Sequence, residues 1–372
     1  MRRQQQAPKG GYMNKGQCEE YIRILQEIHP DKGGSAVRKQ RLQGNIDPAY
    51  ALDIIVPAYN VEEYIDECMR SILGQETDFH FRLIVTDDGS TDGTGNAVEK
   101  YRDRENVTVI HQNNGGLSAA RNAALERSTS EYVMFVDSDD TLPPDAVQKL
   151  VSAAQDGEED IVAGSYCNFR RFRWLKKTYR QRPGVIVSDS ELKGHAWAKV
   201  FRRSLFENIQ FPERYWFEDS VMHQIIYPAA KRKSGIGDIV YERRINNSSI
   251  THKSAGNPGS LDSLWVTLRL MEDRKLLGMA FTLEYYGYLL RQTVLTHRRL
   301  EGLGQKVQES AFYVMCCRIN ENIGRSGFDP EMRSPLEEAV RKGDYKAFSA
   351  YAQVRRATRA RSEISIEREN HE

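Results

Sequence analysis

Short apolar runs alternate with stretches of helical periodicity between residues 52 and 163. The apolar runs have the nearly continuous hydrophobicity that is typical of strands covered on both faces. They are Leu52–Val56, Phe81–Thr86, Val107–Ile110, Tyr132–Val136 and Asp160–Ala163. Helical spacing follows at Ile65–Leu73, Leu117–Arg127 and Pro144–Ala154, and Asn60 is expected to cap the first of these helices. Strands that alternate with helices predict an α/β fold with a mostly parallel, doubly wound sheet flanked by helices.

The pattern of apolar and polar residues is different on either side of this segment. Residues 1–50 are polar, with one expected helix near Glu19–Ile28, and predict a loosely attached leader. Beyond residue 261 the apolar positions recur with helical spacing, in Leu261–Leu277, Phe281–Leu295 and Val307–Ile323. We therefore predict three parts: a polar leader at 1–50, an α/β domain at 51–258 and an α-helical C-terminal domain or extension at 259–372.

Composition narrows the class of protein. The 372 residues carry a net charge of only +1, which argues against a nucleic-acid-binding protein. The five cysteines are dispersed, as expected of free thiols in a reducing compartment. The start of the chain shows no secretory signal, and no stretch approaches the roughly 18–20 apolar residues of a spanning helix. We expect a cytoplasmic protein, soluble or in peripheral contact with the inner face of a membrane.

Carboxylates are concentrated directly after the fourth predicted strand. The segment reads Asp137-Ser138-Asp139-Asp140, and three like charges so close together suggest a nearby positive partner. Oxygen ligands suit Mg²⁺ or Mn²⁺, which share their coordination shell with substrate phosphates. The pattern therefore indicates a metal–diphosphate site, with an Asp-rich turn as the alternative.

Three further polar loops follow predicted strands. In a parallel sheet, ligands bind beyond the carboxyl ends of the strands, so these loops should converge with the carboxylate cluster. The four loops are Pro57–Asn60, Asp87–Asp92, Asn113–Gly116 and Asp137–Asp140. Their convergence is stronger support for a binding site than any one motif.

Several single residues have both a functional and a plain structural interpretation. Asp88 could accept a hydrogen bond from a base or ribose, or belong to a turn that caps a helix. Arg121 could bind a diphosphate through its guanidinium, or be a surface arginine. Asp219, beside aromatic residues, could act as a general base or cap a helix. His252 could contact a metal or phosphate, or be a bystander in a polar loop.

Another segment, 170–182, combines basic residues with aromatic ones. Such a pattern could meet anionic lipid head groups or a phosphate-bearing acceptor. An exposed hairpin or loop with a solvated face remains the alternative.

As a set, the motifs of the α/β segment resemble family 2 glycosyltransferases in order and spacing, over about residues 50–252. The matching segments are 54–60, 87–92, 114–122, 135–140, Trp197-Ala198-Lys199 with Phe201-Arg202, and Glu218-Asp219. The resemblance implies a GT-A (Rossmann-like) fold and a metal-dependent, inverting transferase that uses Mn²⁺ or Mg²⁺. It further implies a nucleotide-diphosphate sugar donor, with UDP expected, and a glycan or lipid-linked saccharide acceptor in polysaccharide biosynthesis.

The resemblance also implies roles for individual residues. Pro57, Tyr59 and Asp88 match positions that hold uracil and ribose, and Arg121 and Lys199 match positions near the donor. Asp137 and Asp139 match the metal-binding Asp-x-Asp, Asp140 lies near the sugar, and Asp219 matches the base. His252 has no sure counterpart, so its metal role stays open.

Two rival functions are weighed against this one, and the first of them uses a similar arrangement of carboxylates. A nucleotidyltransferase acting on a sugar phosphate would need a Gly-rich loop with a lysine near the first strand, where Pro57–Asn60 offers none. A non-catalytic adaptor on a transferase fold would be expected to have lost the carboxylates, which are present here.

Overall fold

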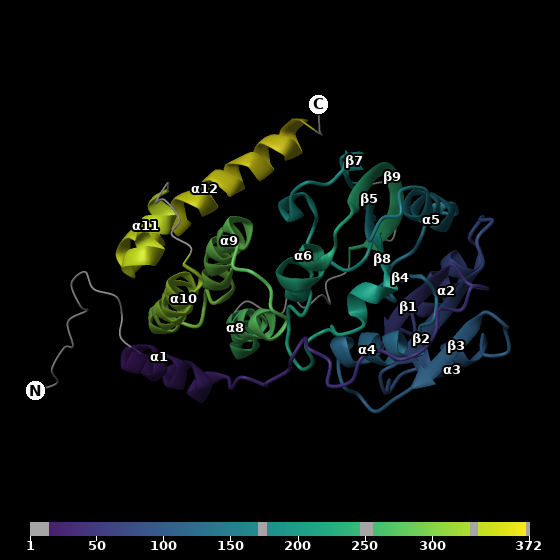
Figure 1. Ribbon diagram of the computed structural model, residues 1–372, viewed down its shortest axis with the longest axis horizontal. Coiled ribbons are helices and arrows are strands. Elements are labelled where there is room, and N and C mark those ends of the chain that lie inside the picture. The colour runs from purple at the N-terminus through teal and green to yellow at the C-terminus, as the bar shows by residue number, and fades with distance from the viewer. Residues whose placement is uncertain (1–14, 170–176, 246–255, 328–333, 370–372) are drawn as a thin grey trace, which may run out of the picture. The chain divides into compact units, whose positions relative to one another are not determined.

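The computed structural model describes residues 15–169, 177–245, 256–327 and 334–369. The chain falls into two compact units. One is built from residues 32–249 and 269–278, and the other from the first 31 residues, residues 250–268 and the chain from Met279 onward. Each unit is described by itself, and Figure 1 labels most of their helices and strands.

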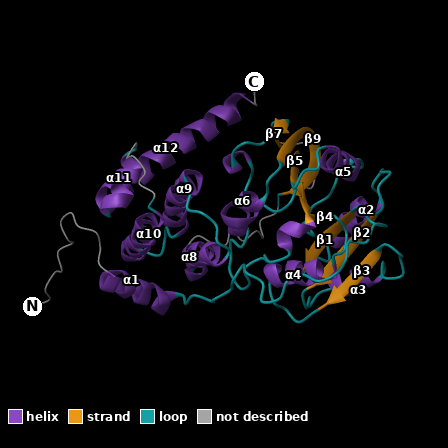
Figure 2. Ribbon diagram, in the orientation of Figure 1, coloured by secondary structure: helices purple, strands orange, loops and turns teal. Residues whose placement is uncertain are grey.

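The first unit is organised around one sheet, drawn in orange in Figure 2. Its strands are β1 (Leu52–Ala58), β2 (Phe81–Asp87), β3 (Val107–His111), β4 (Tyr132–Phe135), β5 (Ile161–Phe169), β6 (Lys177–Tyr179), β7 (Gly184–Val185), β8 (Lys199–Arg202) and β9 (Lys233–Arg244). Their order is β3-β2-β1-β4-β8-β5-β9-β7, with β6 paired to β5. Strands β1 to β4 run parallel, β8 runs antiparallel between β4 and β5, and β9 runs parallel to β5.

Helices cover both faces of this sheet. Alternate residues of β1, β2 and β4 share one hydrophobic core with α2 (Ile65–Leu73), α3 (Thr94–Glu99) and α5 (Ala146–Asp156). The opposite face carries α4 (Leu117–Arg127), which contacts β1 and β2. On that face Phe135 packs at 5.1–5.9 Å against the rings of Phe201, Phe206 and Phe211. Side chains of a strand alternate between faces, so both layers follow from apolar runs that are nearly continuous.

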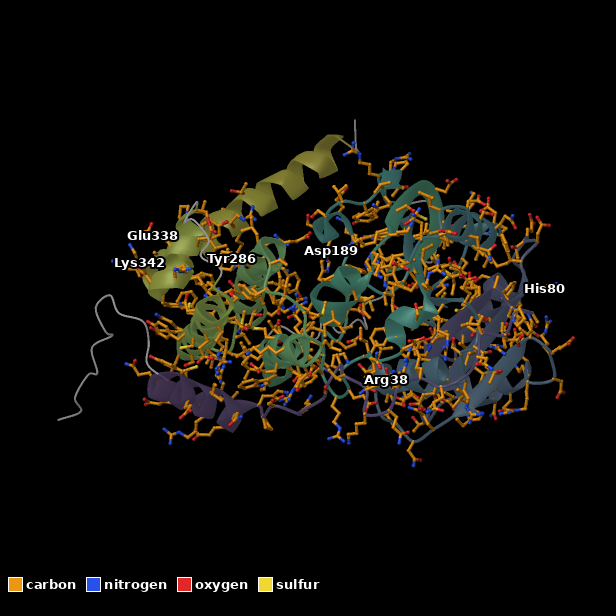
Figure 3. The ribbon with its side chains drawn as sticks, viewed as in Figure 1. Arg38, His80, Asp189, Tyr286, Glu338 and Lys342 are labelled. Carbon is orange, nitrogen blue, oxygen red and sulfur yellow. The ribbon has the colours of Figure 1, made fainter. Side chains whose placement is uncertain are left out.

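Short elements complete the unit. They are the 3₁₀ turns Asp189–Glu191 and Arg203–Phe206, the π-helical turn Met222–Ile226 and the helix α6 (Tyr227–Ala229). Residues before β1 also pack in this unit. For example, the backbone N–H of Ala36 donates to Asp273 at 2.7 Å. The buried Arg38, labelled in Figure 3, donates to the carbonyls of Phe206 and Ile209.

The second unit is helical in its described part. Its helices are α1 (Lys15–Ile28), part of α8 (Asp262–Leu276), α9 (Leu283–Arg299), α10 (Gln305–Ser326), α11 (Pro335–Lys342) and α12 (Tyr345–Glu369), with a 3₁₀ turn at Pro258–Leu261. Tyr21 of α1 stacks on Tyr313 of α10 with ring centroids 5.0 Å apart. No helix of the described ranges combines the length and hydrophobicity that crossing a membrane requires.

The predicted fold class is confirmed: a mostly parallel sheet flanked by helices, followed by a helical C-terminal region. The expected cap at Asn60 is wrong. Helix α2 begins only at Ile65, and Asn60 adopts a left-handed φ of 51°. Its Oδ1 instead accepts the backbone N–H of Thr91 at 2.8 Å, which joins the loops that follow β1 and β2.

At the end of β3, His111 contacts two carboxylates. Its Nδ1 lies 2.9 Å from Asp87 and its Nε2 contacts Glu99. The hydrogen bond to Glu99, with that to Asp87, raises the pKa of His111 although burial opposes it. The protonated form is therefore favoured by folding, and this stabilisation is complete below the unfolded pKa of about 6.5.

We expect His111→Gln to lower the free energy of unfolding more at about pH 6 than at about pH 9, because the contribution of His111 is lost as the pH rises through its raised folded pKa. Urea unfolding of both proteins at the two pH values measures the difference. An equal loss at both would contradict an ionised histidine here.

Candidate active site

The carboxylate turn 137–140 leaves β4 at the carboxyl edge of the sheet and is held from β9. The backbone N–H of Asp137 donates to the Tyr241 hydroxyl at 3.0 Å, and that hydroxyl donates to Asp140 Oδ2 at 2.7 Å. The backbone N–H of Arg244 donates to Asp140 Oδ1 at 2.6 Å. Asp140 is thus buried and engaged by protein donors at both oxygens. Burial, followed by the charges of Asp139 and Asp137, raises its pKa.

Arg244 fixes the same turn through its side chain. Its Nε donates to the carbonyl of Asp139 at 2.8 Å, and its Nη2 donates to Glu67 at 2.7 Å. The guanidinium also lies 4.6 Å from the centre of the Phe169 ring. Tyr241 and Arg244 were not predicted as site residues, because their strand gives no motif and its pairing with the turn depends on tertiary structure.

Arg121 is the centre of the site. Its guanidinium donates to Glu218 at 2.9 Å and to Asp219 and Asp137 at 3.0 Å each. It is only 1% exposed and packs over Phe211. Burial opposes its charge, but Asp219, Asp137 and Glu218 outweigh that effect and raise the pKa of Arg121. The interpretation of Arg121 as a surface arginine is therefore wrong.

Other α4 side chains bring the second carboxylate pair to Arg121. Asn122 binds the backbone of Phe211 through both its amide oxygen and nitrogen at 2.9 Å, and the Ser118 hydroxyl donates to the carbonyl of Pro212 at 2.8 Å. The chain then turns through Phe217, whose φ of 63° is unfavourable for a bulky residue. This turn presents Glu218 and Asp219 to α4.

Glu218 and Asp219 differ in access to solvent. The Glu218 side chain is 8% exposed and that of Asp219 33%. Burial, together with the charge of Asp219, raises the pKa of Glu218 to about 7 against the effect of Arg121. Burial also raises the pKa of Asp219, again opposed by Arg121. The carboxylate of Asp219 binds Arg121, so the alternative of a plain helix cap for this side chain is not what the structure shows.

The predicted nucleotide-contacting residues take up different environments. Asp88 is 2% exposed and accepts the backbone N–H groups of Gly115 and Gly116 at 2.8 and 2.7 Å, so it orders the loop before α4. Pro57 is buried within β1, whereas Tyr59 is 48% exposed. Of these three, Tyr59 has the side chain most open to a ligand.

Lys199 is a buried cation close enough to Asp219 to feel its charge. Its Nζ donates to the carbonyl of His195 at 2.9 Å. Burial lowers the pKa of Lys199 to about 7, with Asp219 acting in the opposite direction. His195 stacks on Trp197 with centroids 3.3 Å apart, and Trp197 stacks on Tyr241 at 4.7 Å. The stacked rings of His195, Trp197 and Tyr241 thus connect Lys199 to the carboxylate turn.

The carboxylate turn fits a divalent cation in its chemistry. Asp137 and Asp139 supply hard oxygen donors. Their negative charges add to the effect of burial, which is the larger one, in raising the pKa of Asp140. In the described part of the chain, no three His, Cys, Asp or Glu side chains are gathered to hold a metal by themselves. Mg²⁺ and similar ions usually take only one or two carboxylates and complete their shell with water and phosphates. His252 lies outside the described residues.

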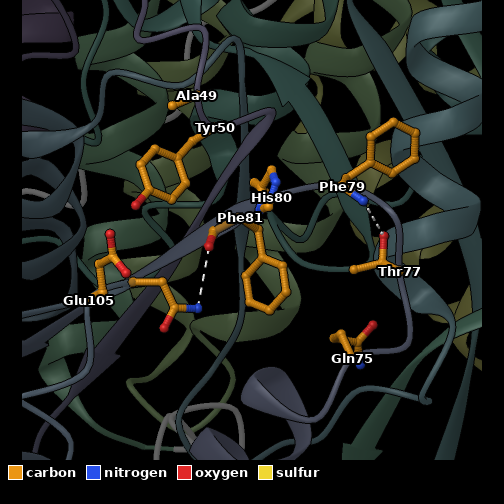
Figure 4. Close-up of a pocket in the computed structure, with 9 residues that line it drawn as sticks. Ala49, Tyr50, Gln75, Thr77, Phe79, His80, Phe81 and Glu105 are labelled. Atoms are coloured by element: carbon orange, nitrogen blue, oxygen red, sulfur yellow. Dashed lines mark hydrogen bonds between the residues drawn. The ribbon is translucent and has the colours of Figure 1, made fainter.

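A separate pocket of about 510 Å³ lies at the opposite edge of the sheet (Figure 4). Tyr50, Phe79 and Phe81 line it, and Phe81 is the first residue of β2. Because the predicted site residues follow the carboxyl ends of the strands, this pocket is not part of their site.

Comparison with known proteins identifies the family of one segment of the chain. Residues 53–212 match the family described as Glycosyl transferase family 2. This segment is a family 2 glycosyltransferase domain. The match covers β1 to β4 and α4, and with them Arg121 and Asp137, and it ends before Glu218 and Asp219.

The relatives of this family 2 domain come from several bacteria. Glycosyltransferase GlyA of Streptococcus pneumoniae is 32% identical over 54% of this chain and 31% of its own length. The uncharacterized glycosyltransferase EpsJ of Bacillus subtilis is 33% identical over 54% of this chain and 62% of its own length. The chain therefore spans less than two thirds of either relative.

A solved structure shows the same fold. The Staphylococcus aureus TarS fragment 1–349, crystallised with UDP-GlcNAc, superposes with a TM-score of 0.51. It is 22% identical and covers 79% of this chain and 92% of the fragment. The GT-A fold expected from the family 2 resemblance is thus confirmed.

Proposed function

We propose that this domain transfers a sugar from a nucleotide-diphosphate sugar, with UDP the favoured nucleotide, to a hydroxyl of a glycan or lipid-linked acceptor, with inversion. The observation that carries the proposal is the meeting of Asp137 and Asp219 on Arg121, each at 3.0 Å. Their side chains are 32% and 33% exposed, so both carboxylates border solvent at one place on the sheet edge.

In this proposal Asp219 acts as the general base. It takes the proton of the acceptor hydroxyl while that oxygen bonds to the anomeric carbon, and the bond from this carbon to the diphosphate oxygen breaks. One displacement on the opposite face gives inversion. The raised pKa of Asp219, caused first by burial, brings its basicity closer to the working pH. Arg121 orients the carboxylate through its hydrogen bond.

The carboxylate turn is assigned to the donor diphosphate. Asp137 and Asp139 would hold Mn²⁺ or Mg²⁺, which when bound neutralises charge on the leaving diphosphate. Tyr59, exposed after β1, is assigned to the nucleoside. Asp88 acts by ordering the loop at Gly115 and Gly116.

We further propose that the acceptor belongs to polysaccharide biosynthesis. TarS of Staphylococcus aureus is named a poly(ribitol-phosphate) beta-N-acetylglucosaminyltransferase and is 31% identical over 50% of this chain and 34% of its own length. Its named acceptor is a phosphate-rich polymer, which supports an anionic glycan as the acceptor here. Peripheral contact with the inner face of a membrane is part of this proposal.

Metal-dependent binding of a nucleotide sugar tests the proposal. A ligand that binds the native state raises its unfolding temperature by mass action. We expect a UDP-sugar with Mn²⁺ to raise the melting temperature of the wild type, and Asp139→Ala to remove most of that shift. Asp103→Ala, at an exposed carboxylate before β3, is the control and should respond like the wild type. Stabilisation by a nucleoside triphosphate with a sugar phosphate, but by no nucleotide sugar, would contradict the proposal.

A further inference from the structure

Tyr241 is a buried residue of β9 that lies outside every motif of the site. Its hydroxyl makes two hydrogen bonds to one turn: it accepts from the Asp137 backbone N–H at 3.0 Å and donates to the Asp140 carboxylate at 2.7 Å. Both functions of a phenolic hydroxyl are therefore committed to residues 137 and 140. The two hydrogen bonds span the turn and fix its first residue relative to its last.

We infer that Tyr241 is a positioning residue for the proposed metal–diphosphate site. The Tyr241 hydroxyl holds the Asp140 carboxylate toward β9 and the backbone of Asp137 at the start of the turn. Asp137 is then held where its side chain reaches Arg121 at 3.0 Å and still borders solvent. This inference rests on the proposed function for its ligand, and on geometry alone for the ordering of the turn.

The surroundings of Tyr241 make its hydroxyl a rigid support. One face of its ring stacks on Trp197, with centroids 4.7 Å apart and planes at 17°. Trp197 in turn stacks on His195 and meets Tyr166 edge to face at 4.7 Å. A ring packed in this way has one orientation, so its hydroxyl can hold two partners without loss of further side-chain freedom.

Tyr241→Phe removes only the hydroxyl and keeps the stacked ring. It leaves the Asp137 N–H and one Asp140 oxygen without this partner. We expect hydrogen exchange at the peptide covering residues 136–141 to be faster in the protein without ligand, because exchange reports local opening. We also expect Mn²⁺-dependent UDP binding, measured by calorimetry, to weaken by about 10–100-fold, the usual effect of losing an outer partner of a metal ligand.

Tyr132→Phe is the matched control, at the other end of β4. Its buried hydroxyl also has two partners, donating to the carbonyl of Ala154 at 3.2 Å and accepting from Arg202 at 2.9 Å. It should leave both exchange at residues 136–141 and UDP binding unchanged. Asp140→Asn changes the other partner of the Tyr241–Asp140 hydrogen bond and should reproduce the effects of Tyr241→Phe. The test therefore still works if one of the two variants fails to fold.

The two measurements separate the inference from the proposed function. Faster exchange with weaker UDP binding in Tyr241→Phe and in Asp140→Asn, but not in Tyr132→Phe, supports both. Unchanged exchange, or an equal effect of Tyr132→Phe, overturns the positioning role, as does faster exchange with unchanged UDP binding. If the wild type binds no UDP with Mn²⁺, the proposed function is wrong, and exchange in the protein without ligand still decides whether Tyr241 orders the turn.

Discussion

Replacing Asp219 by Asn is expected to reduce turnover by about 10²–10⁴-fold, the usual loss when a general base is removed. An asparagine keeps the shape of the side chain, and its amide oxygen can still accept from Arg121, as Asp219 does at 3.0 Å. Donor affinity should therefore change little, because only the proton acceptor is missing. Steady-state kinetics with the donor found by thermal shift, together with calorimetric UDP binding, measures the two effects.

Glu218→Gln is the matched control, since Glu218 accepts from the same guanidinium at 2.9 Å but is almost fully buried. It should retain most of the turnover. The causes that raise the pKa of Asp219, burial and the charge of Asp137, are kept in this variant. The acidic limb of the kcat/KM profile is then expected to stay near that of the wild type. Turnover of Asp219→Asn within about threefold of the wild type, well short of a general-base loss, would remove Asp219 from this role.

The sheet could be predicted from the sequence because its signals are local. Apolar runs such as Tyr132–Val136 and the helical spacing of Leu117–Arg127 locate β4 and α4 closely. The cap predicted at Asn60 is wrong for a tertiary reason. Its amide oxygen binds Thr91, which follows the neighbouring strand, and no short-range pattern encodes that choice over a helix terminus.

The sequence pointed to residues of the candidate site but not to the contacts between them. The motifs identified Arg121, Asp137 and Asp219, whereas the structure shows that Arg121 binds both carboxylates and is closed to solvent. Tyr241 could not be found in this way. It lies about a hundred residues beyond the turn it supports and reaches that turn only through the order of the strands.

Removal of the charge at Arg121 is expected to have the largest effect on stability. Arg121→Met leaves Glu218, Asp219 and Asp137 without their shared cation, and breaking a buried ion pair costs about 3–5 kcal/mol. That is a large part of the roughly 5–15 kcal/mol that stabilises a typical domain. Urea unfolding of the wild type and the variant measures the loss.

The loss should also depend on pH, with a definite sign. Burial already raises the folded pKa of Glu218 to about 7 in the presence of Arg121, and without the arginine the folded pKa must rise further. An unfolded glutamate loses its proton near pH 4.3, so stability falls as the pH rises from there through the folded pKa. Arg121→Met should therefore lose more stability at about pH 8 than at about pH 5.

Arg203→Met separates this effect from the loss of any buried arginine. Arg203 is 2% exposed and donates to the carbonyls of Ser128 and Gln43 at 2.8 and 3.1 Å. Those acceptors do not titrate, so its loss should be far less dependent on pH. If Arg121→Met lost the same free energy at both pH values, the three carboxylates would not be held by this charge. The closeness of Asp219 to the carboxylate turn would then need another cause.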